Sequence, residues 1–143
     1  MISSRKMSKH AFNQAAYNDC DSKAKEVAIK YLSSIGIQAR ENDNEYGIDL
    51  LAVIGNREIG IEVEVKVAWE LLFPWSTITI PYRKRRFMIA GDILFLFNHD
   101  FTQMAIVPEH TLKRLIRKNT KSTENELFFD IPTEEATFIC LVP

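Results

Sequence analysis

Two short stretches, GIDLLAVI and GIEVEVKV, carry the side chains best suited to chemistry. In the second stretch Glu62, Glu64 and Lys66 alternate with apolar residues, so a strand would place all three on one face. In the first stretch Asp49 stands at the start of an otherwise apolar strand, where a lone carboxylate would be costly to bury. Such a face either meets solvent, as in a half-buried strand, or carries carboxylates and a lysine into a metal site.

The dipeptide Gly55-Asn56 between the two stretches is typical of a β-hairpin turn. Folding the chain about this turn brings Asp49 roughly opposite residues 62–64, so three carboxylates would converge with Lys66 one step further along. Like charges repel unless a cation lies between them, and Mg²⁺ is a hard cation that prefers oxygen ligands. A metal ion of this kind activates water for attack on a phosphate, and a lysine can hold that water or contact the phosphate.

The surrounding sequence predicts the elements that would position these residues. A helix begins at Asp21-Ser22 and ends at Gly36, and short helices are expected over residues 82–90 and 108–118. Strands are expected over residues 37–40, 48–54, 57–67, 92–98, 103–107, 127–131 and 137–142. This order predicts an α/β fold in which a central mixed β-sheet is flanked by α-helices.

Length and composition predict one domain over residues 1–143, with residues 1–18 as a loose arm or an extra helix. No apolar run approaches the roughly 20 residues that a membrane span needs, so we expect no membrane partner. Cys20 and Cys140 are far apart and predict reduced thiols in a cytoplasmic protein, in the host cytoplasm if a phage encodes it.

Positive charge is concentrated in the middle of the chain. Residues 81–122 carry nine basic and three acidic side chains, whereas the whole chain has a net charge of -1. The densest basic run predicts a grip on the DNA backbone or, alternatively, an exposed solvated helix. Its candidate DNA-binding residues are Arg83, Lys84, Arg85 and Arg86. For Trp69 and Trp75, packing is favoured over base stacking or a dimer face.

The order helix, short strand, YGIDLLAV, hairpin, IEVEVKV resembles the core of the PD-(D/E)XK nuclease superfamily, which has a restriction-endonuclease-like fold. The pattern is most similar to the branch of Holliday-junction-resolvase-like and phage nucleases, and it covers roughly residues 21–67. The resemblance implies that Asp49 and Glu64 bind the metal and that Lys66 is the catalytic lysine. It also implies the backbone carbonyl of Val65 as a metal ligand.

Two further acids are candidates for a supporting role at that metal. Glu62 lies outside the motif but on the same face of the strand. Many members of the superfamily carry a glutamate on the first helix, and Glu26 is the best candidate for it here.

These observations together predict an Mg²⁺-dependent DNA endonuclease in which Mn²⁺ can substitute for Mg²⁺. In the absence of a separate recognition domain we expect it to recognise the structure of duplex or branched DNA, as a junction resolvase does. A homodimer would provide two sites for cutting two strands. Two alternatives stay open: a non-catalytic nucleic-acid-binding or assembly subunit that keeps the nuclease fold, and an unrelated interaction domain whose charges face solvent.

Overall fold

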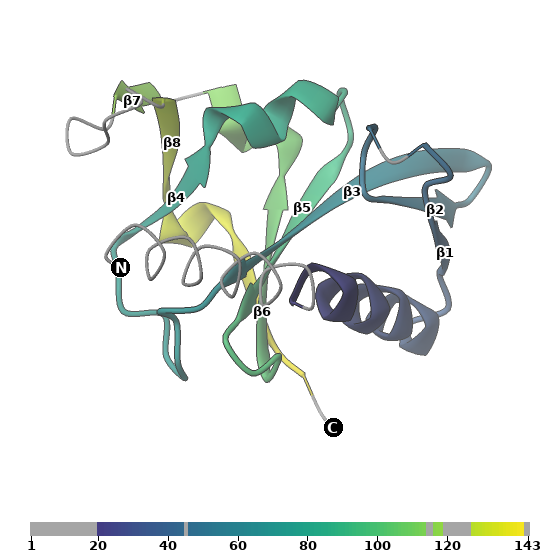
Figure 1. Cartoon of the computed structure of the whole chain (residues 1–143), viewed down its shortest axis with the longest axis horizontal. Helices are drawn as coiled ribbons and strands as arrows, with labels where there is room; N and C mark the ends of the chain where they lie inside the picture. Colours follow the sequence, from purple (N-terminus) through teal and green to yellow (C-terminus); the bar gives the residue numbers. More distant parts are fainter. Residues whose placement is uncertain (1–19, 45, 114–115, 119–126, 142–143) are drawn as a thin grey trace, which may run out of the picture.

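The computed structural model describes residues 20–44, 46–113, 116–118 and 127–141, and the expected arm over residues 1–18 lies outside them. Its larger sheet has six strands in the order β1-β2-β3-β5-β6-β9. A smaller sheet of three strands has the order β4-β8-β7 (Figure 1). The strands of the larger sheet are β1 (Gln38–Glu41), β2 (Leu50–Ile54), β3 (Arg57–Lys66), β5 (Ile93–Asn98), β6 (Gln103–Pro108) and β9 (Thr137–Cys140). Those of the smaller sheet are β4 (Thr77–Pro81), β7 (Ile116–Lys118) and β8 (Leu127–Pro132).

The helix and the first hairpin form where the sequence predicts them. Residues 20–34 are helical, and Gly36 takes a φ of 85° while its N–H bonds the carbonyl of Ser33, which closes the last turn. The hairpin of β2 and β3 turns at Gly55, whose φ of 63° is a conformation that glycine adopts without strain. The strand pair β3·β5 is parallel and its neighbouring pairs are antiparallel, which makes the sheet mixed as predicted.

Both faces of the larger sheet are covered, and each face has its own apolar core. The helix over residues 20–34 packs on one face through Ala24, Ala28 and Leu32, which meet buried residues of β2, β3 and β5. On the other face, residues of the smaller sheet pack against Leu94 and Leu96 of β5. In Figure 1 the helix lies below β3, and the smaller sheet with the segment Tyr82–Phe87 lies above it. Ile61, Val63 and Val65 of β3 belong to the core on the helix side, so the alternating Glu62, Glu64 and Lys66 point toward the smaller sheet.

Two predicted helices differ from the structure. Residues 82–90 form only the short 3₁₀ helix η1 (Tyr82–Phe87). The helix expected over residues 108–118 is wrong: a 3₁₀ turn, η2 (Glu109–Lys113), is followed by β7, which pairs with β8 in antiparallel register. Pairing with the next strand along the chain supplied the backbone partners here and overrode the local helical pattern. Between residues 67 and 82, where the sequence predicts no strand or helix, the structure contains β4, which pairs with β8.

A buried aspartate fixes β3 against β5. Asp92, just before β5, accepts hydrogen bonds from the N–H groups of Gly60 at 2.9 Å and Ile89 at 2.9 Å. A Cβ at position 60 would lie 2.8 Å from Asp92 Oδ2, so the approach requires glycine there. This contact sets the register that brings the polar residues of β3 beside β5. Among the residues described, no helix has the length and apolar character needed to cross a bilayer.

Candidate active site at the end of the first hairpin

The loop before β2 holds Asp49 in place through its backbone. The N–H of Asn42 donates to the carbonyl of Asp49 at 3.1 Å, and Asn42 Nδ2 donates to the carbonyl of Ile48 at 3.0 Å. Gly47 lets this amide come close, because a Cβ at that position would lie 2.8 Å from Asn42 Nδ2. The glycine of the GID motif therefore allows the loop to fix the aspartate at the mouth of the strand.

Asp49 and β3 exchange hydrogen bonds directly. The backbone N–H of Asp49 donates to Glu62 Oε1 at 3.0 Å, and the N–H of Val63 donates to Asp49 Oδ2 at 3.0 Å. The register that pairs Leu50 with Ile61 places position 49 beside position 62. The structure thus brings Asp49 to the residues expected from the hairpin, and its direct partner is Glu62 and not Glu64.

Burial changes the protonation of this pair. Glu62 is only 3% exposed, and burial together with the nearby charge of Asp49 raises the pKa of Glu62 to about 8. Burial also raises the pKa of Asp49, although the N–H of Val63 and the charge of Lys84 act in the opposite direction. Burial therefore favours the protonated form of Glu62, and the nearby charge of Lys84 acts in the opposite direction.

A lysine from η1 completes this part of the site. Lys84 is 9% exposed, and its Nζ lies 3.9 Å from Glu62 Oε2 and 3.4 Å from the carbonyl of Val63. Lys84 belongs to the basic run predicted to bind DNA, and the structure buries it against the acids. Sequence spacing gave no signal for this contact, because residues 62 and 84 meet only through the packing of η1 on the sheet.

Glu64 and Val65 lie one step further along β3 and offer two oxygen atoms. Glu64 Oε2 is buried and has no hydrogen-bond partner among the described residues. Backbone groups of a strand alternate in direction, and both the N–H and the carbonyl of Val63 are used at the β2 edge. The carbonyl of Val65, two residues on, is therefore directed to the same edge, beyond the last residue of β3 that pairs with β2.

These oxygen donors fit a hard divalent cation. Within the described part of the chain, no three acidic, histidine or cysteine side chains converge as a complete ligand set. Mg²⁺ does not require one, since it keeps several waters and binds through one or two carboxylates plus substrate phosphates. The carboxylate oxygen of Glu64 without a hydrogen-bond partner and the carbonyl of Val65 would supply protein ligands of the kind it prefers.

Lys66 lies apart from the Asp49–Glu62 pair. It sits at the end of β3 and lines a pocket of about 270 Å³ together with Phe73, Trp75 and Thr77. Trp75 is 42% exposed, and its ring meets that of Phe73 edge to face, with the ring centroids 5.1 Å apart. Trp75 therefore contributes both to packing and to the rim of a pocket that contains Lys66.

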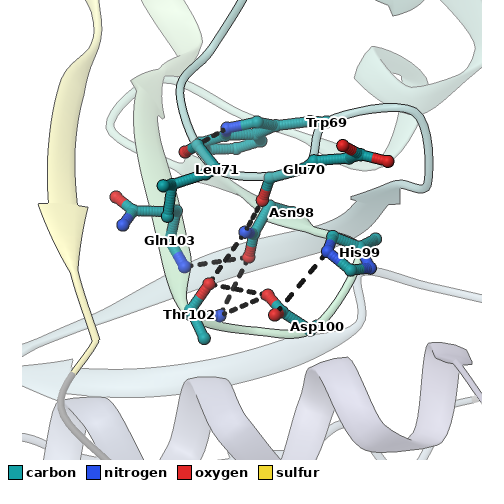
Figure 2. Close-up of polar contacts among 8 residues, drawn as sticks. All are labelled: Trp69, Glu70, Leu71, Asn98, His99, Asp100, Thr102 and Gln103. Atoms are coloured by element: carbon teal, nitrogen blue, oxygen red, sulfur yellow. Dashed lines mark hydrogen bonds and ion pairs between the residues drawn. The ribbon is translucent and has the colours of Figure 1, made fainter.

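The end of β3 is anchored by a buried asparagine on β5. Asn98 is opposite Lys66 in the sheet register and is fully buried. Its Oδ1 accepts hydrogen bonds from the N–H groups of Thr102 at 2.9 Å and Gln103 at 2.8 Å. Figure 2 shows its Nδ2 donating to the carbonyl of Glu70 and to the hydroxyl of Thr102. This network ties the loop after Lys66 to the turn between β5 and β6.

The helix presents a different acid from the one expected. Glu26 is exposed. The negative charge of Asp21 instead helps to raise the pKa of Asp49, and Asp21 forms a 3.4 Å ion pair with Lys25. Asp21 precedes the buried Ala24 by three residues, so helical spacing puts it on the covered side of the helix. That spacing was the available sequence signal for Asp21.

The basic run divides into inward and outward side chains. Arg85 forms a 3.1 Å ion pair with the buried Glu109. Arg83 and Arg86 are exposed, and the guanidinium of Arg86 lies 4.6 Å from the ring centroid of Phe87. Of the four basic residues predicted to grip DNA, Arg83 and Arg86 are therefore the ones at the surface.

Comparison with solved structures identifies a related fold. Hjc, a Holliday junction resolvase from the archaeal hyperthermophile Archaeoglobus fulgidus, superposes with a TM-score of 0.51 over 76% of this chain and 87% of its own. The two sequences are 16% identical over this match. No protein-family model and no curated protein matches the sequence. The chain has an α/β fold of the restriction-endonuclease-like type.

Proposed function

We propose that this protein is an Mg²⁺-dependent DNA endonuclease that hydrolyses phosphodiester bonds. The observation that carries the proposal is the buried Asp49–Glu62 pair beside Glu64, whose Oε2 has no hydrogen-bond partner among the described residues. This arrangement stands in a fold that is similar to that of a Holliday junction resolvase. A buried carboxylate oxygen without a partner is costly, so a functional cation site explains the position of Glu64 Oε2 better than a solvated strand face does.

Each residue of the proposed site has a distinct role. Asp49, Glu64 and the carbonyl of Val65 would hold Mg²⁺, with Mn²⁺ able to replace it, while Glu62 supports Asp49 through the hydrogen bond from its backbone N–H. When bound, the metal ion would supply an activated water and neutralise negative charge on the phosphate. Lys66 would contact the scissile phosphate or the attacking water as a compact positive charge. Asp21 on the helix is a further candidate for support, in place of the exposed Glu26.

The proposed substrate is duplex or branched DNA, with a Holliday junction as the finer proposal. The exposed Arg83 and Arg86 would contact backbone phosphates, which fix position without reading sequence. One acidic site per chain cuts one strand, so we propose that a homodimer cuts two.

A cleavage assay with matched variants tests the proposal. Plasmid, linear and four-way-junction DNA are incubated with Mg²⁺, Mn²⁺ or EDTA. The variants are Asp49→Asn and Glu64→Gln, and Glu58→Gln is the control because Glu58 is an exposed glutamate on the same strand. We expect metal-dependent cleavage by the wild type and the Glu58→Gln variant, and loss of cleavage in the other two.

The other outcomes identify competing functions. Cleavage that survives Asp49→Asn would falsify the assignment of the site. DNA binding without cleavage in either metal would instead identify a non-catalytic nucleic-acid-binding subunit that keeps the fold. Preference for the four-way junction over linear duplex would support the resolvase form of the proposal.

A further inference from the structure

The strand β3 repeats a two-residue unit, and the two copies differ in whether a cation lies beside their oxygen atoms. The units are Glu62-Val63 and Glu64-Val65, and each combines a carboxylate on one face with a carbonyl directed to the β2 edge. In the first unit the Lys84 Nζ lies 3.9 Å from Glu62 Oε2 and 3.4 Å from the carbonyl oxygen of Val63. In the second unit the Glu64 Oε2 has no hydrogen-bond partner among the described residues.

The position of Lys84 is fixed by the fold around it. Lys84 belongs to η1, whose neighbours Pro81 and Met88 are buried. Its side chain is 11% exposed and that of Glu62 is 4% exposed, so solvent screens this contact weakly. An ammonium held in this way cannot leave for the surface without giving up two buried oxygen partners.

A lysine ammonium and a divalent cation compete for the space beside a carboxylate and a carbonyl oxygen. Both are attracted to a carboxylate and a carbonyl oxygen, and each repels the other at short distance. A cation that is part of the chain therefore excludes a metal ion from the unit that it fills. The neighbouring unit, two residues along, stays available.

We propose that the Lys84 ammonium is a resident cation of the Glu62-Val63 unit and directs divalent metal binding to the Glu64-Val65 unit. Lys84 is then a positioning residue, because it acts through the acids and not on the substrate. The inference rests on the proposed nuclease function for the identity of the metal, but its geometry comes from Lys84, Glu62 and Val63 alone.

Calorimetric titration of metal-free protein with MnCl₂ or MgCl₂ tests this inference. We expect the Lys84→Met variant to bind an additional ion, or the same ion at least tenfold more tightly, because the first unit is then open. The gain should vanish in the double variant Lys84→Met/Glu62→Gln. Lys84→Arg keeps the charge and should titrate like the wild type, and Lys30→Met, at an exposed lysine of the helix, is the control that should show no gain.

A second measurement covers the case in which Lys84→Met fails to fold, as judged by circular dichroism. In the single variant Glu62→Gln the Glu64-Val65 unit is untouched, so wild-type metal affinity should persist, whereas Glu64→Gln should abolish it. Equal affinity and stoichiometry in folded Lys84→Met and wild type would overturn the inference, as would loss of metal binding in Glu62→Gln.

The result is separable from that of the cleavage assay. If the wild type never cuts DNA but the Lys84→Met variant gains a metal ion, the proposed function fails and this inference stands. If the wild type cuts DNA but Lys84→Met does not change metal binding, this inference fails and the proposed function stands.

Discussion

The two ends of the polar face of β3 are built differently. At the hairpin end Glu62 is 3% exposed and lies among hydrogen-bond and ionic partners from the β2 mouth and η1. At the far end Lys66 lines an open, partly aromatic pocket, and the strand is held there by the buried Asn98. The same alternation of residues produced both ends, so the difference comes from the elements that close over the strand. The alternation of residues predicts which side chains share the polar face of β3, and the packing of other elements determines how buried each of them is and which groups it contacts.

The largest expected effect comes from removing the acid that links the two strands. Asp49→Asn should reduce cleavage by about 10³-fold, whereas Lys66→Met should reduce it by about 10²-fold, since it removes one positioned charge. Single-turnover cleavage rates at saturating Mg²⁺ measure both. Equal loss in the two variants would mean that the two ends of the polar face act as one catalytic unit.

Asn98 is expected to control stability and not metal binding. Asn98→Ala leaves the N–H groups of Thr102 and Gln103 without their acceptor and should lower the free energy of unfolding by about 2–4 kcal/mol. Urea denaturation measures the change. The exposed Asn56→Ala variant, in the hairpin turn, serves as a surface control. A loss below about 1 kcal/mol for Asn98→Ala would show that the network is not needed to anchor the far end.

The raised pKa of Glu62 predicts how stability depends on pH without metal. Between the ordinary pKa of 4.5 and the folded value of about 8, the unfolded chain has released this proton while the folded protein still holds it. Folding is therefore favoured by this group at low pH, and that stabilisation is lost as the pH rises toward 8. Glu62→Gln cannot ionise, so its midpoint temperature should fall less than that of the wild type between pH 5 and pH 8.5.

Thermal unfolding in EDTA across this range checks the sign of the effect. The variant Glu58→Gln, at an exposed position of the same strand, should follow the wild type. Parallel pH profiles for wild type and Glu62→Gln would contradict the burial of an ionisable pair at the hairpin end. Added Mg²⁺ should flatten the wild-type profile, because a bound cation favours the ionised acids.

The smallest effect is expected at the surface of η1. Arg83→Ser and Arg86→Ser should each weaken DNA binding modestly and lower the slope of log affinity against log salt by about one. Arg40→Ser, at an exposed arginine on β1, is the control. Fluorescence anisotropy at several salt concentrations measures the slopes. Unchanged slopes would remove the surface arginines from the DNA-binding face.

Much of the fold could be predicted because its signals are local. Gly36 and Gly55 mark the end of the helix and the hairpin turn, and both have positive φ in the structure. The strand β7 could not be predicted, because the local pattern of residues 108–118 favoured a helix and only the pairing with β8 made it a strand. Of the candidate site, Asp49 was placed beside residue 62 by the hairpin register alone.

The sequence by itself determined the two strands, their turn and the face that carries Glu62, Glu64 and Lys66, because residue period and turn chemistry are properties of neighbouring residues. Only the tertiary structure decided that Lys84 enters the site from η1 and that Arg85 pairs with the buried Glu109. Contacts between distant segments depend on how layers pack, and no spacing along the chain encodes them. The burial that raises the pKa of Glu62 arises from that same packing.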